Sequence, residues 1–428
     1  MRQAKRTKWR RLENAAKISP ATSNKKDERV FRMACELTQD VQPAALQTAL
    51  DETMEDFALF RCVLRKGLFW NYFEQSALCP VVREEYKAPC SRLYNPNRKQ
   101  LLFEVTYYRR RINVEIFHAL ADGTGTARFL KAIVYRYLML THPAEVSGPL
   151  TRLNIDGTDT EKSEDSFTKY YSKDKAAEPI PKYRAYQLPK PLLENGEMQI
   201  FEGVASTAAL RGLAKQHNTT ITVFLASVLL CAVAKDMSTR DKQRPVALMI
   251  PVNLRKMFPS ESVRNFFGWI DLGYDFGKNS EALADVVQYT AAFFAREITP
   301  PRMATRMNGL VKLERNGLMR LVPLEIKALF MQLGNYASRH ADTAVFSNIG
   351  VITMPEECAP FIRLFDFFTS TGKMELCSCS YADNLVMAFT TAYESTNIYR
   401  NFFCMLTQLG VQINVAARIP QEETNENV

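Results

Sequence analysis

Histidine is scarce in this chain, and patterns that mark several common protein classes are missing. Only four of its 428 residues are histidine. The sequence has neither a Gly-x-Gly-x-x-Gly motif nor a phosphate-loop motif, which disfavours a dinucleotide-dependent enzyme or an NTPase. The most apolar run, residues 221–234, is too short to span a bilayer and contains Thr and Ser, so it predicts a buried helix. We therefore expect no transmembrane segment.

The nine cysteines form neither a disulfide framework nor a zinc-binding pattern. Their number is odd and their spacing is irregular. Cys377 and Cys379 lie two apart on a predicted strand, so they share one sheet face, and no second Cys/His pair lies nearby in the sequence. We expect reduced thiols, no metal site and a cytoplasmic protein.

Basic charge is concentrated at the start of the chain. The first 17 residues carry seven basic groups and one acid, Glu13, a net +6 that leaves +3 of the total +9 for the remainder. No apolar core follows these charges, so they do not form a signal peptide. No basic stripe interleaved with aromatics and no nucleic-acid-binding module is present, which excludes nucleic acid as a partner. This basic leader, residues 1–17, is either a solvated start of the chain or a segment that attracts anionic partners, such as an acidic carrier protein acting in trans.

Length and composition predict two globular units. The chain is 46% hydrophobic, and strands alternate with amphipathic helices on both sides of a polar, proline-containing stretch at about 145–195. We predict an α/β (or α+β) fold with an N-terminal unit at 1–190, ending in this linker, and a C-terminal unit at 191–428. No repeat of fixed period is found, and we expect a monomer.

Periodicity places the main elements. The expected strands are 29–37, 60–74 and 101–117 (two hairpins), 244–255, 343–354 and 385–394. The expected helices follow Pro43 and Gly125 and cover 206–217, 219–235, 280–298, 320–335 and 396–409.

The segment VEIFHALADGTGTARFL, residues 114–130, carries the strongest chemical signal. His118 follows a predicted strand and precedes a predicted helix, a position that holds a side chain rigidly beside a crevice. Gly123 and Gly125 remove side-chain bulk from the turn, and Asp122 can anchor the loop through a cation. A neutral imidazole can take a proton from a hydroxyl or amine at neutral pH. His118 is therefore either the general base of an acyl transfer or a core histidine beside ordinary turn residues.

The run His118-Ala-Leu-Ala-Asp122-Gly123 resembles the HxxxDG motif of the CoA-dependent acyltransferase superfamily. This superfamily includes chloramphenicol acetyltransferase, plant BAHD enzymes, condensation domains of nonribosomal peptide synthetases and alcohol acetyltransferases. The pattern is most similar to free-standing bacterial alcohol acetyltransferase-like proteins. The supporting segments, in the expected order, are WRRLENAAKISP, HALADGTGTARFL, LAKQHNTTITVFLASVLL, PVNLRKMFPSESVRNFFG and FSNIG.

The resemblance implies two α/β lobes in a V with a central tunnel that contains His118. His118 would be the general base, and Asp122 would support the site through an ion pair with Arg255 in the VNLR segment. Ser347 and Asn348 would lie near the tunnel and could contact substrate or the oxyanion, although Asn348 could equally form an Asx turn. Acyl-CoA, or a phosphopantetheinyl thioester, would be the co-substrate, with no permanently bound cofactor.

The sequence departs from the superfamily in two ways. Phe117 replaces the first of the two histidines usual in condensation domains, and the BAHD signature DFGWG is missing; residues 265–269 only superficially resemble it. Three functions stay open. The first is acyl transfer from acyl-CoA to an alcohol or amine, the second is condensation with a carrier-bound acyl group, and the third is a catalytically silent protein that binds an acyl or lipid ligand.

Overall fold

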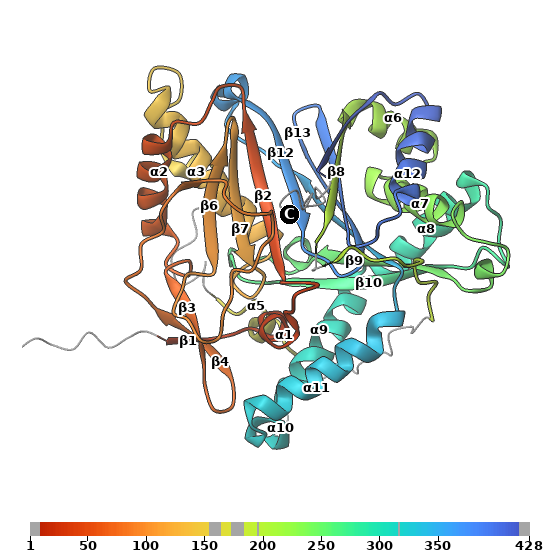
Figure 1. Ribbon diagram of the computed structural model, residues 1–428, viewed down its shortest axis with the longest axis horizontal. Coiled ribbons are helices and arrows are strands. Elements are labelled where there is room, and N and C mark those ends of the chain that lie inside the picture. The colour runs from red at the N-terminus through yellow and green to blue at the C-terminus, as the bar shows by residue number, and fades with distance from the viewer. Residues whose placement is uncertain (1–8, 154–163, 173–183, 195–196, 316, 419–428) are drawn as a thin grey trace, which may run out of the picture.

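The chain folds into two α/β lobes that lie side by side (Figure 1). The structure is a computed structural model, and it describes residues 9–153, 164–172, 184–194, 197–315 and 317–418. The first lobe contains a five-stranded sheet in the order β12-β2-β7-β6-β5 and a three-stranded sheet in the order β1-β4-β3. The five strands are β2 (Val30–Leu37), β5 (Arg83–Glu84), β6 (Phe103–Tyr108), β7 (Arg111–Phe117) and β12 (Ile362–Thr369). The smaller sheet contains β1 (Trp9–Arg11), β3 (Cys62–Lys66) and β4 (Asn71–Gln75).

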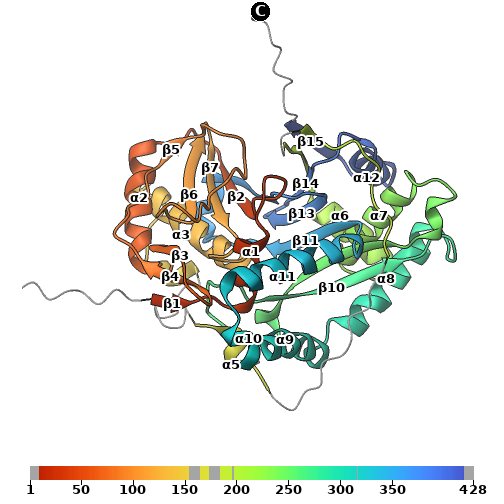
Figure 2. The same ribbon diagram turned by 60° about the horizontal axis from the view of Figure 1, so that its bottom comes forward.

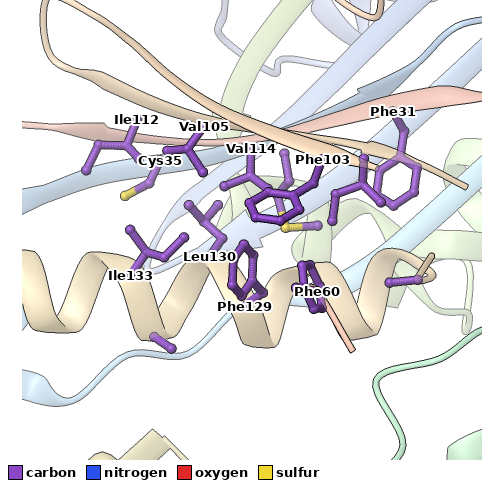
Figure 3. Close-up of a cluster of buried hydrophobic side chains, with 14 of the residues drawn as sticks. Phe31, Cys35, Phe60, Phe103, Val105, Ile112, Val114, Phe129, Leu130 and Ile133 are labelled. Carbon is purple, nitrogen blue, oxygen red and sulfur yellow. The ribbon is translucent and has the colours of Figure 1, made fainter. Parts of the chain in front are cut away.

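Two helices cover one face of the five-stranded sheet. Helix α2 (Pro43–Asp56) begins at the predicted proline and buries Leu46, Ala49, Leu50, Thr53 and Met54, a spacing that places them on one face. Helix α3 (Gly123–Thr141) packs beside it, and its Phe129, Leu130 and Ile133 meet the strand side chains (Figure 3). Phe60 stacks on Phe129 with ring centroids 4.0 Å apart. This aromatic and aliphatic core fixes the loop that leads into α3.

The second lobe is built on a seven-stranded mixed sheet. Its order is β10-β9-β11-β13-β14-β8-β15. The strands are β8 (Gln199–Ser206), β9 (Val246–Asn253), β10 (Phe267–Tyr274), β11 (Ala344–Val351), β13 (Met374–Tyr381), β14 (Asn384–Thr391) and β15 (Ile413–Arg418). The helices against it are α6 (Thr207–Gln216), α7 (Ile221–Ala234), α8 (Leu283–Glu297) and α12 (Asn397–Gln408).

The most apolar run of the sequence is the central helix of this lobe. Helix α7 buries every residue from Val223 to Ala234, as its composition predicted. Thr220 accepts a hydrogen bond from the Val223 N–H and so caps the helix start. Within the described residues, no single helix has both the length and the apolar composition to cross a bilayer. Helices α6 and α7 meet that test only together, as a pair bent by 81°.

The two lobes do not correspond to two consecutive halves of the chain. Strand β12 belongs to the C-terminal half of the chain but pairs antiparallel with β2, where Phe365 lies opposite Cys35. The described parts of the predicted polar linker also pack tightly, because Phe167 is buried against Phe266 and Tyr186 is buried in the second core. Residues 154–163 and 173–183 of that linker lie outside the described residues. The domain boundary at residue 190 stays a prediction.

Three helices follow α8 and form an extension that lies below the large sheets in Figure 1. They are α9 (Pro300–Arg315), α10 (Gly317–Leu321) and α11 (Leu324–Ala337). Helix α11 lies beside α1 (Asn14–Thr22), across the junction of the two lobes (Figure 2). The sequence predicted a helix at 320–335, which corresponds to α11, but α9 was not expected. The helix expected after Gly125 begins two residues earlier, because Asp122 is its N-cap.

Candidate active site

The candidate site is built on the loop between β7 and α3. The backbone N–H of His118 donates to the carbonyl of Arg29 at 2.8 Å, which extends the β2–β7 pairing by one residue. Ala119, Leu120 and Ala121 are fully buried, so the loop is anchored by its own apolar side chains. His118 itself stays partly exposed, with its ring 5.1 Å from that of Phe31 and 5.6 Å from that of Phe267. The imidazole therefore lies at the contact between the two lobes.

The hydrogen bonds of Asn265 define the tautomer of His118. The Asn265 Oδ1 lies 3.0 Å from His118 Nδ1, while Asn265 Nδ2 donates to the His118 carbonyl at 3.0 Å and to Glu13 Oε1 at 2.9 Å. A carbonyl and a carboxylate only accept hydrogen bonds, so they fix the orientation of the amide. The proton of neutral His118 must then be on Nδ1, and the lone pair on Nε2. Among the described residues, Nε2 has no hydrogen-bond partner.

Glu13 and Arg264 hold Asn265 in place. The Glu13 carboxylate is 1% exposed and accepts hydrogen bonds from the Asn265 backbone N–H at 3.2 Å and from Arg264 Nε at 2.6 Å. The sequence did not predict that Glu13 and Asn265 would lie beside His118. Glu13 was counted only as the lone acid of the basic leader, and its isolation among seven bases was the one available signal. Asn265 lies 147 residues from His118, and no local pattern connected them.

Burial favours the neutral form of His118. It lowers the pKa of the imidazole below its ordinary value of 6.5, and the positive charge of Arg29 acts in the same direction. A hydrogen bond with its own backbone carbonyl, the charge of Asp122 and the Asn265 contact oppose this shift in pKa without cancelling it. A neutral imidazole at neutral pH has the protonation state that a general base needs.

Asp122 and Arg255 meet in a buried ion pair between the lobes. Arg255 Nη1 donates to Asp122 Oδ2 at 2.7 Å, and both side chains are 7% exposed. The same carboxylate accepts the backbone N–H of Phe266 at 2.9 Å, and its Oδ1 accepts the N–H of Gly125 at 2.9 Å. Arg255 also donates from Nε to the Ser262 carbonyl at 3.1 Å. Both charges are thus hydrogen-bonded on several sides, the condition for tolerating burial.

The two glycines of the motif allow the lobes to approach closely. A Cβ on Gly125 would lie 1.9 Å from the carbonyl oxygen of Val263, and one on Gly123 would lie 3.1 Å from Ile349 Cδ1. The segment 262–266 therefore passes directly against the first turn of α3, which is how Asn265 and Phe266 reach the His118 loop.

We expect Gly125→Ala to lower the free energy of unfolding by about 2–3 kcal/mol, because the new methyl group would overlap backbone that cannot move freely. Chemical denaturation measures this change. The matched control is Gly212→Ala in α6, where a Cβ meets no atom within 4 Å. That substitution should be neutral or stabilising by about 0.5–1 kcal/mol. Equal stability of the two variants would contradict the close approach at Gly125.

The two predicted substrate or oxyanion contacts on β11, Ser347 and Asn348, have different hydrogen-bond partners. Asn348 Oδ1 accepts the Gly350 N–H at 2.8 Å, an Asx-type turn, and its Nδ2 donates to Thr222 at 2.9 Å. Its amide is thereby occupied. Ser347 is partly exposed, and its hydroxyl has no hydrogen bond to a described residue. It lies opposite Cys377 of β13, whose side chain belongs to the core of the first lobe, so Ser347 lies on the side of the sheet that faces that lobe.

Other predicted features lie elsewhere. Phe117, which occupies the position of a second histidine, is fully buried and stacks on Tyr94 with centroids 4.9 Å apart. It belongs to the core of the first lobe. Two pockets lie on the second lobe, one beside Tyr274 and Tyr289 and one beside Leu188, and His118 lines neither. The tunnel stays a prediction.

The fold is that of CoA-dependent acyltransferases and condensation domains, so the predicted fold class is confirmed. Polyketide synthase associated protein 5 from Mycobacterium tuberculosis has a TM-score of 0.60 and 14% identity, covering 94% of this chain and 97% of its own. Trichothecene 15-O-acetyltransferase from Fusarium sporotrichioides has a TM-score of 0.60 and 10% identity, covering 94% of each chain. The starter condensation domain of rhizomide synthetase, solved with C8-CoA and Leu-SNAC, has a TM-score of 0.60 and 11% identity, covering 94% of each chain. No family model and no curated protein matches the sequence.

Proposed function

We propose that this protein is an acyltransferase that moves an acyl group from an acyl-CoA thioester to an alcohol or amine, with His118 as the general base. The observation that carries the proposal is the fixed tautomer of His118. Asn265 holds Nδ1–H, and Nε2 is left with its lone pair and no partner among the described residues. Solved structures of the same fold include an O-acetyltransferase and a condensation domain with C8-CoA bound, which agrees with this chemistry.

The reaction would proceed by direct transfer. His118 Nε2 takes the proton of the acceptor O–H or N–H as the acceptor oxygen or nitrogen attacks the thioester carbonyl. The C–S bond then breaks, and the imidazolium returns its proton to the departing thiolate, so the products are the ester or amide and the free thiol of CoA. The Asn265 contact keeps the ring oriented throughout, and orientation of both reactants supplies much of the rate enhancement.

A donor to the oxyanion would come from β11. Ser347 has a hydroxyl without a partner among the described residues and lies on the side of the sheet that faces the first lobe, whereas the Asn348 amide is engaged by Thr222 and Gly350. We assign the role of oxyanion or substrate contact to Ser347 rather than to Asn348. Asp122, Gly123 and Arg255 support the site without touching the substrate.

A donor and acceptor screen tests the proposal. Native mass spectrometry with acyl-CoAs of graded chain length would identify the preferred donor, and release of free CoA thiol in the presence of alcohols and amines would identify the acceptor. An acyl phosphopantetheine donor, tested alone and on a carrier protein, distinguishes the condensation-type alternative. Retention of an acyl ligand without thiol release for every acceptor would favour a silent binding protein instead.

The pH dependence gives a separate test of the base and its positioning residue. Because burial lowers the pKa of His118, the midpoint of the acid limb of kcat/KM should lie below 6.5, the ordinary pKa of an imidazole, since Nε2 becomes protonated only at lower pH. Asn265→Ala removes a contact that raises this pKa, so it should move the acid limb to still lower pH and lower kcat by about tenfold or more. A loss of activity with an unshifted acid limb would assign Asn265 a purely structural role.

A further inference from the structure

Helix α11 exposes most of its large apolar side chains, whereas it buries a lysine, Lys327. Five large side chains, each between 46% and 66% exposed, lie at a spacing of three or four along the helix; we call them the α11 apolar stripe. They are Ile326, Leu329, Phe330, Leu333 and Tyr336. Residues at this spacing share one helix face. Isolated exposed apolar residues are ordinary, but a continuous row on one face points to a binding surface.

The inward face of α11 shows that this orientation is imposed by the fold. Lys327 is 2% exposed, and its ammonium donates to the Phe69 carbonyl at 3.1 Å and lies 3.5 Å from the centroid of the Trp70 ring. Asn335 accepts a hydrogen bond from Arg29 at 3.4 Å, and Gln332 Nε2 donates to the Ala21 carbonyl at 3.0 Å. These polar contacts hold the helix with its apolar stripe outward.

Neighbouring side chains enlarge the apolar surface at the start of α11. Leu321 is 72% exposed just before the helix, and the tip of the β3–β4 hairpin adds Leu68, which is 71% exposed, and Phe69. The hairpin touches the helix directly, because the Leu324 N–H donates to the Leu68 carbonyl at 2.9 Å. The surface therefore continues from one element onto another.

The charges around the apolar stripe are basic at both ends. Arg320 precedes α11 and Arg339 follows it; both are exposed, and neither forms an ion pair with a described residue. The single exposed acid of the helix, Glu325, is paired with Lys66 at 2.9 Å. If two copies of the chain paired antiparallel along α11, Arg320 of each copy would face Arg339 of the other, a repulsive arrangement. An anionic surface would instead be attracted at both ends.

We propose that the α11 apolar stripe docks this protein onto an anionic lipid surface. Apolar and aromatic side chains flanked by arginines are the composition of helices that lie in the membrane interface. Docking would bring the lipid close to the candidate active site, since Arg29 binds Asn335 through its side chain and accepts the His118 N–H through its carbonyl. The proposal concerns binding alone and stands independently of the reaction.

Vesicle flotation with the full chain tests the docking. The vesicles contain phosphatidylcholine with about one-third phosphatidylglycerol, and phosphatidylcholine alone provides the neutral comparison. The wild-type protein should float with the anionic vesicles and more weakly with the neutral ones. Failure of the wild-type protein to float with anionic vesicles would overturn the proposal.

Two double variants separate the contributions. Leu329→Ser with Phe330→Ser should lower the partition coefficient at least about tenfold, because two apolar anchors are lost. Arg320→Gln with Arg339→Gln should lower it by about tenfold or more on anionic vesicles and change it little on neutral ones. The matched control is Leu140→Ser, an exposed leucine at the end of α3, which should bind as the wild type does.

Size-exclusion chromatography with light scattering tests the alternative that a second copy of this chain covers the α11 apolar stripe. The lipid proposal is wrong if the variant Leu329→Ser with Phe330→Ser floats as well as the wild type. It is also wrong if the wild-type protein is a dimer that does not bind vesicles and this double variant is a monomer. In the second case the face joins two copies of the chain. Because Leu329 and Phe330 are exposed, an unchanged melting temperature should accompany the loss of vesicle binding.

Discussion

His118→Ala is expected to lower kcat for acyl transfer by about 10³-fold while leaving donor binding nearly unchanged. The substitution removes Nε2, the atom that the proposed mechanism uses to take the acceptor proton, and general base catalysis typically contributes about 10²–10⁴-fold. Release of CoA thiol, with the donor and acceptor identified by the screen, measures the rate. Native mass spectrometry of the acyl-CoA complex measures donor binding, so a loss in kcat is separated from a loss of the binding site.

His142→Ala is the matched control for this prediction. His142 lies at the end of α3 and stacks on Phe361 with ring centroids 3.9 Å apart, outside the candidate site. Its replacement should leave kcat unchanged. Undiminished turnover in His118→Ala would remove His118 from the mechanism, whatever the His142 variant does.

Asp122→Ala is expected to lower the free energy of unfolding by about 3–5 kcal/mol. The substitution leaves the Arg255 guanidinium buried without its anion, and removing one member of a buried ion pair has a cost of this size. It also removes the N-cap of α3 and the acceptor for the Phe266 N–H. Arg255→Ala should destabilise the protein to a similar degree. Chemical denaturation monitored by tryptophan fluorescence measures both.

A more exposed ion pair in the same region, whose side chains are 20% and 50% exposed, provides the comparison. Arg128 binds Glu261 at 2.8 Å, and the Glu261 side chain is half exposed, so Arg128→Ala should cost less than about 1 kcal/mol. The double variant Asp122→Ala with Arg255→Ala should lose less stability than the two single variants added together, because no unpaired charge remains. If Asp122→Ala cost no more than Arg128→Ala, the buried pair would not be what joins the lobes here.

Elements with strong local periodicity were predictable from the sequence. The stripe of α2 after Pro43, the cap of α6 at Ser206 and the end of α12 before Gly410 all match the structure, because each depends on residues within one or two helical turns. Strand β12 and its pairing with β2 were not predicted. The partners lie more than 300 residues apart, and no local pattern encodes which distant strand completes a sheet.

For the candidate site, the sequence by itself determined the spacing of His118, Asp122 and Gly123 on one strand–loop–helix unit, since these residues are neighbours along the chain. Only the tertiary structure decided what surrounds them. The 254–266 segment between β9 and β10 brings Arg255 to Asp122 and Asn265 to His118, and Glu13 arrives from the start of the chain. The physical reason is that a ring's tautomer and pKa depend on atoms within hydrogen-bonding distance and on burial, and distant packing sets both.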